Sequence, residues 1–222
     1  MFSEGVHLID KPKGWTSFDV VNYIRGIVAK DLGKKPKNVK VGHAGTLDPL
    51  ATGLLIVLVG KEFTKQASQY SKMDKTYEVT MKLGQTSVTG DEEGEKKTVN
   101  SRQPTVEEVE EAINKFVGAI MQTPHSFSAI KVNGQRAYKL ARAGKEVVIE
   151  PRKITVYSIQ LTDYSYPEVK FTTKVSSGTY IRSLVEDIGK QLKTGAYMSG
   201  LRRTKIADFS VDKAFIFENL VK

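Results

Sequence analysis

A segment rich in glycine and other small residues, residues 41–53, carries a single carboxylate, Asp48. Pro49 follows it, and a proline disfavours the helical conformation of the preceding residue, which predicts an extended backbone at Asp48. An ionised carboxylate can act as a covalent nucleophile when it is held against an electrophilic carbon. Asp-Pro is also common in turns, so the residues alone leave open the alternative that Asp48 only stabilises a turn.

A fixed cation beside such a carboxylate would lower its pKa and orient it, and Arg182 is the candidate. Arg182 follows Gly178-Thr179-Tyr180-Ile181 and falls in the first turn of an expected helix. An arginine on a helix surface is usually solvated, which is the alternative interpretation. The pairing of Arg182 with Asp48 is therefore a hypothesis at this point.

Composition disfavours several other kinds of chemistry. The 222 residues include no cysteine, which excludes thiol nucleophiles, disulfides and cysteine-based metal sites. The three histidines, His7, His43 and His125, are far apart in sequence, so we expect no metal site. Gly60-Lys61 lacks the glycine spacing and the following Ser or Thr of a phosphate-binding loop, and no G-x-G-x-x-G motif occurs.

The charge balance points to a polyanionic partner. The chain has 34 Lys and Arg against 25 Asp and Glu, a formal net charge of +9, which favours nucleic acid, although many basic proteins only carry solvated lysines. The longest apolar run, residues 54–59, is far shorter than the roughly 20 residues of a membrane-spanning helix. No signal peptide is visible at the N-terminus. We therefore expect a cytoplasmic protein that does not bind a membrane.

Hydrophobic periodicity predicts helices and strands without a regular βαβ alternation, so we expect an α+β fold on a mixed sheet. Capping-box patterns begin at Thr16 and Thr105. The acidic loop 90–95 is expected to be solvated, and Asn133-Gly134 is a turn signal. The expected strands are 6–9, 54–59, 76–83, 147–150, 154–161, 169–175 and 198–209, and the expected helices are 16–33, 105–117, 135–143 and 180–192.

Six sequence blocks, in order along the chain, resemble the TruB-type family of bacterial tRNA pseudouridine synthases. The signature loop is Gly42-His43-Ala44-Gly45-Thr46-Leu47-Asp48-Pro49-Leu50-Ala51-Thr52-Gly53-Leu54-Leu55. One block would be weak, whereas six in the right order are specific. The other blocks are residues 7–17, Lys75-Thr76-Tyr77, residues 84–94, residues 122–142, and residues 177–184 with Leu201-Arg202-Arg203.

The resemblance implies a pseudouridine-synthase fold, with a central mixed, largely antiparallel sheet flanked by helices and loops. It also implies an insertion at about residues 122–152 that grips RNA. We expect residues 1–222 to form a single catalytic domain. The small C-terminal RNA-binding domain of the PUA type, which many relatives carry, is expected to be absent.

The resemblance also implies the catalytic residues. Asp48 matches the aspartate that attacks the flipped uridine while the glycosidic bond breaks and the base rejoins the sugar through carbon 5. Tyr77 matches the tyrosine that packs against the target base, and Arg182 matches the arginine that pairs with the aspartate. Extruding a base costs a few kcal/mol. Stacking on aromatic side chains returns about 1–3 kcal/mol per base.

Further implied contacts bind the RNA. His43 would enter the space left by the extruded bases, and Tyr180 and Leu201 would line the substrate pocket. Lys131 in the insertion and Arg202 would contact phosphates. Other candidates for phosphate contacts are residues 34–40, Arg136, Lys139, Arg142 and Arg203.

The implied substrate is the uridine at position 55 in the T loop of tRNA, recognised mostly through the folded shape of the T stem-loop. We expect no cofactor, because the reaction is an internal rearrangement, and we expect a monomer. Two alternatives remain: a tRNA-binding chaperone that folds the T arm with little or no catalysis, and a sister synthase acting on another RNA uridine. His125 and Phe127 depart from the family pattern, and we expect these departures to change only the packing of the insertion.

Overall fold

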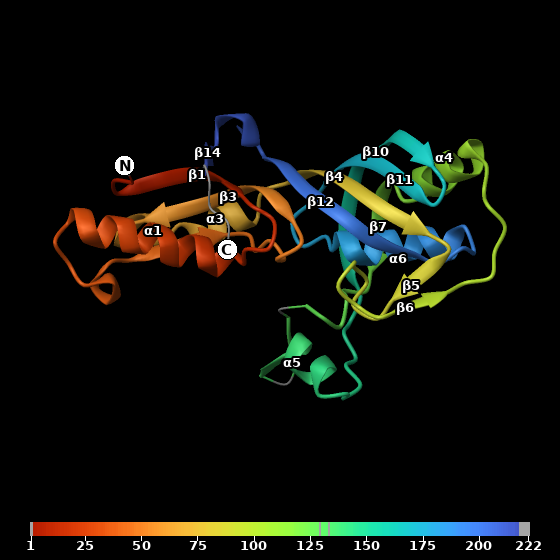
Figure 1. The fold of residues 1–222 in the computed structure, drawn as a ribbon, viewed down its shortest axis with the longest axis horizontal. Coiled ribbons are helices and arrows are strands. Elements are labelled where there is room, and N and C mark those ends of the chain that lie inside the picture. Colours follow the sequence, from red (N-terminus) through yellow and green to blue (C-terminus); the bar gives the residue numbers. More distant parts are fainter. Residues whose placement is uncertain (1, 129, 133, 218–222) are drawn as a thin grey trace. The chain divides into compact units, whose positions relative to one another are not determined.

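The computed structural model describes residues 2–128, 130–132 and 134–217 of the chain. The chain forms two compact units. The first unit comprises Met1–Tyr77 and Leu201–Lys222, and the second comprises Glu78–Gly200. Strands β4 (Lys75–Leu83) and β12 (Ala196–Ile206) run from one unit into the other (Figure 1).

Strand β3 is the centre of the first unit. It spans Thr52–Val59 and pairs antiparallel with β1 (Gly5–Lys11) and with β2 (Val41–Ala44). Its first two residues pair parallel with Arg202 and Arg203 of β12. Every residue of β3 from Gly53 to Val59 is buried, as the uninterrupted apolar run predicts for a strand covered on both faces. The elements of this unit are β1 (Gly5–Lys11), α1 (Ser17–Asp31), η1 (Pro36–Asn38), β2 (Val41–Ala44), β3 (Thr52–Val59), α2 (Lys61–Thr64), α3 (Ala67–Ser71), β13 (Phe209–Ser210), η2 (Val211–Lys213) and β14 (Phe215–Ile216).

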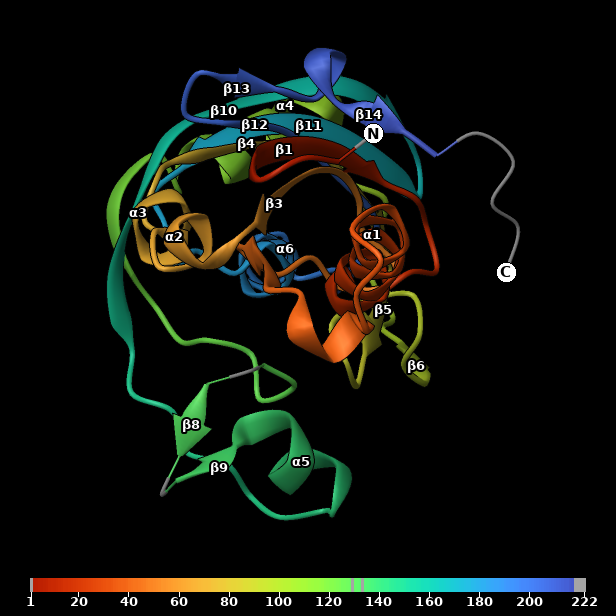
Figure 2. The ribbon, with the colours of Figure 1, turned by 90° about the vertical axis from the view of Figure 1, so that its left-hand side faces the viewer.

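Helix α1 begins at a capping box, as predicted. The Thr16 hydroxyl accepts the N–H of Asp19 at 3.0 Å, and the Asp19 carboxylate accepts the N–H of Thr16 at 2.8 Å. These bonds satisfy backbone donors that the first helical turn leaves free, which fixes where the helix starts. The buried face of α1 packs on one face of β3 through Val20, Val21, Ile24 and Val28. Helices α2 and α3 lie on the other side of β3 (Figure 2), where Phe63, Ala67 and Tyr70 pack against the cluster that contains Leu54, Ile56 and Leu58.

The second unit is built on the strand order β12-β4-β11-β10-β7. Strand β10 pairs antiparallel with β11 and with β7. Helix α4 begins at a second capping box, at Thr105, and α6 buries Leu184, Val185 and Ile188. The remaining elements are β5 (Gln85–Ser87), β6 (Lys96–Thr98), α4 (Val106–Asn114), β7 (Gly118–Gln122), β10 (Arg152–Ser165), β11 (Glu168–Val175) and α6 (Ile181–Gln191).

The insertion between β7 and β10 is a small hairpin followed by a short helix. Strands β8 (Lys131–Val132) and β9 (Gln135–Arg136) pair antiparallel, and α5 (Ala137–Arg142) follows directly (Figure 2). The Ala137 N–H donates to the carbonyl of Ile130 at 2.7 Å, which ties the start of the helix to the hairpin. The predicted Asn133-Gly134 turn involves Asn133, which lies outside the described residues.

The predicted α+β class is confirmed. Strands β14 and β1 pair parallel, as do the ends of β3 and β12, while the pairs β1–β3, β2–β3, β7–β10 and β10–β11 are antiparallel, so the sheet is mixed. Across residues 2–128, 130–132 and 134–217, no helix has the length and apolar character needed to cross a bilayer.

Three sequence predictions about elements are wrong in detail. Residues 147–150 form no strand, because only Ile149 of this segment is buried and Val148 is exposed, so the segment has no apolar face to place on a sheet. The expected helix 135–143 is shortened because Gln135 and Arg136 pair with β8. The expected strand 198–209 stops at Ile206, because Ala207 adopts a φ of 46° and Phe209 turns back to pair with Ile206.

Candidate active site

Asp48 lies in the loop between β2 and β3, and its side chain is half-buried. Its main-chain carbonyl accepts the N–H of Ala51 at 3.1 Å, so a turn does form here, as Asp-Pro predicts. The backbone closes this turn through the carbonyl oxygen. The neighbouring apolar side chains Leu47, Leu50 and Ala51 are buried. The loop is therefore anchored on the core on both sides of Asp48.

The hydroxyl of Ser17 fixes the residue directly before Asp48. Ser17 is the first residue of α1 and is 2% exposed. Its Oγ accepts the N–H of Leu47 at 2.9 Å and donates to the carbonyl of Leu47 at 3.1 Å. The Ser17 side chain thus binds both the N–H and the carbonyl of Leu47, and the capped helix α1 fixes the position of Ser17.

The opening segment of the chain holds the residue after Asp48. The Gly14 N–H donates to the carbonyl of Pro49 at 2.8 Å. Lys11 is fully buried, and its ammonium group donates to the carbonyls of Trp15 at 2.6 Å and Pro12 at 2.9 Å, and reaches Pro49 at 3.5 Å. Carbonyl oxygens thus compensate the buried charge of Lys11, as a buried ammonium group requires.

Arg203 holds the two ends of the same loop. Its side chain is 1% exposed, its Nε donates to the carbonyl of Leu54 at 2.7 Å, and its Nη2 donates to the carbonyl of Gly45 at 2.8 Å. The expectation that Arg203 contacts phosphate is wrong, since a guanidinium buried under the loop does not reach RNA. Sequence reasoning missed its structural role, because a basic residue next to Arg202 gives no sign of burial.

His43 lies in β2, where it pairs with Val57 of β3. Burial and the positive charge of Arg203 hold the pKa of His43 below its usual value. Its buried Nδ1 has no hydrogen-bond partner within the described parts of the chain. His43 is therefore a neutral ring at physiological pH.

Lys75, at the start of β4, belongs to the same charged neighbourhood. Burial, followed by the charge of Arg203, lowers the pKa of Lys75 to about 8, against a smaller raising effect of Asp74. Its ammonium group donates to the carbonyls of Ser71 at 2.6 Å and of Met73. The sequence block Lys75-Thr76-Tyr77 pointed to this position without giving it a role.

Three further predicted residues belong to the first unit. Tyr77 lies in β4 with its side chain 7% exposed, and Leu201 is half-buried in β12. Arg202 forms a two-point ion pair with Asp10 in β1, at 3.0 and 2.7 Å. Because Asp10 neutralises part of its charge, Arg202 is less free to attract phosphate than an isolated arginine. Asp10 was not identified from the sequence, where it lies 192 residues away from Arg202.

Arg182 belongs to the second unit and is 8% exposed, so the alternative of a solvated surface arginine is wrong. Its Nη1 donates to the carbonyl of Thr89 at 2.9 Å, and its Nη2 donates to the carbonyl of Phe127 at 3.0 Å. Nη1 also lies 3.5 Å from the carboxylate of Asp91. Arg182 thus joins three segments that are far apart in sequence.

Asp91 corrects the prediction that loop 90–95 is solvated. It is 6% exposed, and its carboxylate accepts the hydroxyl of Thr89 at 2.6 Å and the N–H of Glu93 at 3.2 Å. A buried guanidinium needs a compensating charge, and Asp91 supplies one. Glu92 and Glu93 are exposed, as predicted for the loop.

Tyr180, the N-cap residue of α6, is held through its main chain. The buried Gln122 accepts the Tyr180 N–H at 2.8 Å and donates to the Tyr180 carbonyl at 3.1 Å. This exchange ties the entry of α6 to the end of β7, which fixes where the side chains of Tyr180 and Arg182 start. Sequence reasoning assigned no role to the Gln122 amide, because glutamine is common on protein surfaces.

The two departures from the family pattern do more than alter packing. The His125 Nδ1 accepts the N–H of Phe127 at 3.1 Å, and its Nε2 lies 3.2 Å from the carboxylate of Glu186 on α6. Since Phe127 supplies one of the carbonyls that hold Arg182, His125 and Glu186 fix the segment that orients the guanidinium.

Lys131 lies on the insertion and is exposed, as a phosphate contact requires.

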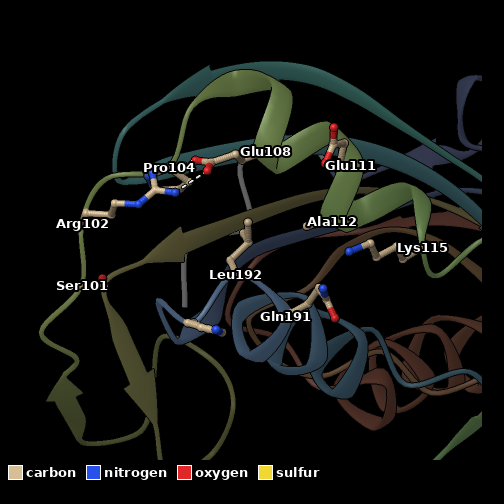
Figure 3. A pocket seen from close by; sticks show the side chains of 10 residues that line it. Ser101, Arg102, Pro104, Glu108, Glu111, Ala112, Lys115, Gln191 and Leu192 are labelled. Atoms are coloured by element: carbon tan, nitrogen blue, oxygen red, sulfur yellow. Dashed lines mark hydrogen bonds and ion pairs between the residues drawn. The ribbon is translucent and has the colours of Figure 1, made fainter.

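The structure therefore brings Asp48, His43, Tyr77, Leu201 and Arg202 into the first unit, and Arg182, Tyr180 and Lys131 into the second. The pairing of Arg182 with Asp48 stays a prediction. A pocket of about 470 Å³ beside α4 and the end of α6 contains none of the predicted residues (Figure 3). Its lining is mixed in charge, and Arg102 in it is already paired with Glu108.

Comparisons with known proteins agree over nearly the whole chain. Residues 32–181 match the model described as TruB family pseudouridylate synthase (N terminal domain), and residues 182–222 match that of the tRNA pseudouridylate synthase B C-terminal domain. A tRNA pseudouridine synthase B from Phocaeicola vulgatus is 44% identical over 220 residues, 98% of this chain and 92% of that protein.

Two solved structures show a similar fold. A chain in the crystal structure of a Cbf5-Nop10-Gar1 complex superposes with a TM-score of 0.70 and 30% identity, over 97% of this chain and 53% of that one. A chain in an H/ACA RNP bound to a substrate RNA containing 2'-deoxyuridine gives a TM-score of 0.67 and 28% identity, over 96% and 50%. This chain thus spans about half the length of those two chains.

Proposed function

Because the chain belongs to the TruB family of tRNA pseudouridine synthases, we propose that it isomerises the uridine at position 55 of the tRNA T loop, with Asp48 as nucleophile. The family makes the chain an isomerase that forms pseudouridine in tRNA. The position of the uridine and the role of the aspartate are the proposal.

The proposed reaction conserves every atom of the nucleotide. The Asp48 carboxylate attacks the extruded uridine, the bond between N1 and the sugar breaks, and the base turns so that carbon 5 bonds to the sugar. The proton on carbon 5 is then lost, N1 of the product carries a proton, and Asp48 leaves as a free carboxylate. A nucleophile of this kind needs a fixed position more than a shifted pKa.

The observation that carries the proposal is how the loop of Asp48 is held. Ser17 binds both polar groups of Leu47, and Gly14 binds the carbonyl of Pro49, so the residues on either side of Asp48 are hydrogen-bonded. A loop whose aspartate only closed a turn would need no such support from two other segments. This preorganisation supports catalysis over the chaperone alternative.

The other residues would bind and orient the nucleotide. Tyr77 would pack against the target base, and Arg182 would pair with Asp48. The neutral ring of His43 would fill the space left by the extruded bases. Tyr180 and Leu201 would line the pocket, and Lys131 and Arg202 would contact phosphates of the T stem-loop. We expect the protein to act as a monomer in the cytoplasm and without a cofactor.

Replacement of the nucleophile tests the proposal directly. Asp48→Asn keeps the shape of the side chain and removes its negative charge. We expect no pseudouridine from this variant by mass spectrometry of a tRNA transcript, while gel-shift affinity for the transcript is retained. The matched control is Asp31→Asn, at an exposed aspartate in the last turn of α1 in the same unit, which should keep full activity.

The other outcomes separate the alternatives. Turnover by Asp48→Asn would remove Asp48 as nucleophile. A wild-type protein that binds the transcript and leaves every uridine unmodified would be the chaperone. Pseudouridine formed in a transcript with cytidine at position 55 would identify the sister synthase.

A further inference from the structure

Arg203 is buried in a way that needs an explanation. A guanidinium stays charged at every accessible pH, and taking a charge out of water costs several kcal/mol unless its surroundings compensate it. Arg182 has a carboxylate in contact, whereas both hydrogen bonds of Arg203, within the described part of the chain, end on carbonyl oxygens. A charge held only by carbonyl dipoles is an expensive way to fill a core position.

The two carbonyls that Arg203 binds have a special relation to Asp48. Gly45 directly follows β2, and Leu54 lies one residue beyond Gly53 in β3. The loop that carries Asp48 is the chain between these two acceptors. One planar group with donors at fixed positions thus spans both ends of the loop, which a lysine with a single ammonium group does not reproduce.

We propose that Arg203 is a positioning residue of the reaction, whose guanidinium fastens both ends of the loop so that the Asp48 carboxylate meets the uridine at a fixed place. The inference rests on the proposed role of Asp48 as nucleophile. Arg203 does not touch the substrate. It acts through the backbone at Gly45 and Leu54, while Ser17 holds Leu47 in between.

The backbone packing at Arg203 supports the same role. Gly53 has a φ of 99°, and a Cβ there would collide with the main chain of Arg203. The pairing of Arg203 with Gly53 between the parallel strands β12 and β3 therefore fixes the register of the arginine along β3. Both the side chain and the main chain of Arg203 are thus held against the end of the loop.

Arg203→Lys is the informative variant, because it keeps the charge and removes the two-point geometry. With a tRNA transcript and enzyme in excess, we expect the single-turnover rate constant to fall about 10- to 100-fold, as misplacement by about 1 Å does. The Kd for the transcript should change by less than about threefold. The control is Arg25→Lys. Arg25 also donates to a main-chain carbonyl, that of Val41 at 3.1 Å, but Val41 lies outside the loop.

A purely structural role gives a different pattern. It would lower rate and binding together, in proportion to the fraction of folded protein measured by circular dichroism, and that result would overturn the proposal. A folded Arg203→Lys with a rate within about twofold of wild type would also overturn it.

A second variant covers the case in which Arg203→Lys does not fold. Gly45→Ala changes the acceptor side, since the new Cβ would lie 3.4 Å from Nη1 of Arg203 at a φ of 81°. The proposal expects a slower reaction with unchanged Kd, and an unchanged rate would overturn it. Asp48→Asn, run in parallel, keeps the two questions apart: if it turns over, the nucleophile is wrong, whereas if it is inactive and Arg203→Lys is normal, only the role of Arg203 is wrong.

Discussion

Two buried arginines, one in each unit, hold loops in place by the same device but balance their charge differently. Arg203 donates to carbonyls at both ends of the Asp48 loop, and Arg182 donates to the carbonyls of Thr89 and Phe127. Arg182 also contacts the carboxylate of Asp91. Burial lowers the pKa of His43 and Lys75, and the charge of Arg203 lowers both pKa values further.

The way in which each charge is balanced determines what each arginine does to its surroundings. A guanidinium matched by a carboxylate is locally neutral, so its removal leaves an opposite charge buried and unpaired. A guanidinium whose partners are carbonyl dipoles remains a net positive charge, and this charge shifts the pKa of neighbouring titratable groups. We therefore expect loss of Arg182 to lower stability, in addition to removing the cation that we propose for Asp48. We expect loss of the Arg203 charge to change the pKa values of neighbouring groups.

The largest expected effect is on the Arg182 network. Arg182→Met should lower the free energy of unfolding by about 3–5 kcal/mol, because Asp91 is left buried without its partner. The double variant Arg182→Met with Asp91→Asn should recover part of the loss. Urea unfolding of the wild type, both single variants and the double variant measures the coupling. Additive losses would contradict the comparison, since they would mean that Asp91 does not compensate Arg182.

The next effect concerns Lys75 and alkaline pH. Its pKa is about 8 in the folded protein, against an ordinary lysine value of 10.5, so between these pH values the unfolded chain binds the extra proton. Stability from this group therefore rises as pH is raised from 8 to 10.5, by up to about 3 kcal/mol. The difference in unfolding free energy between the wild type and Lys75→Met, followed over this range, measures it. Lys72→Met, at an exposed lysine nearby, should keep the wild-type pH dependence.

The smallest effect is the titration of His43. Its pKa lies below 6.5 in the folded protein, so the unfolded chain takes up the proton first, and stability falls as pH drops below 6.5. With only three histidines in the chain, NMR can follow each imidazole. Arg203→Gln should raise the pKa of His43, since the charge that lowers it is removed. An unchanged titration curve would show that burial alone sets it.

Local features of the fold were predictable from the sequence. The apolar run at residues 54–59, the capping box at Thr16 and the turn at Asp48-Pro49 all depend on neighbours within a few residues. Propensity, periodicity and proline geometry act at that range, which is why these features were identified correctly.

Features that depend on distant partners were not predictable. Asp91 was predicted to be solvated because its sequence neighbours are acidic. It is buried because its carboxylate pairs with Arg182, which lies 91 residues further along the chain. Arg203 was assigned to RNA for the same kind of reason, although its acceptors lie 149 and 158 residues away. One sequence shows which residues carry charge, and it does not show which of them tertiary packing removes from water.

The contact between Gly53 and the backbone of Arg203 makes position 53 a point of unusual sensitivity. A single methyl group added there would push β3 and β12 apart, and the Arg203 guanidinium would no longer reach both carbonyls of the loop. Under the proposed role of Asp48, its reactivity would depend on the absence of a Cβ at Gly53, five residues downstream.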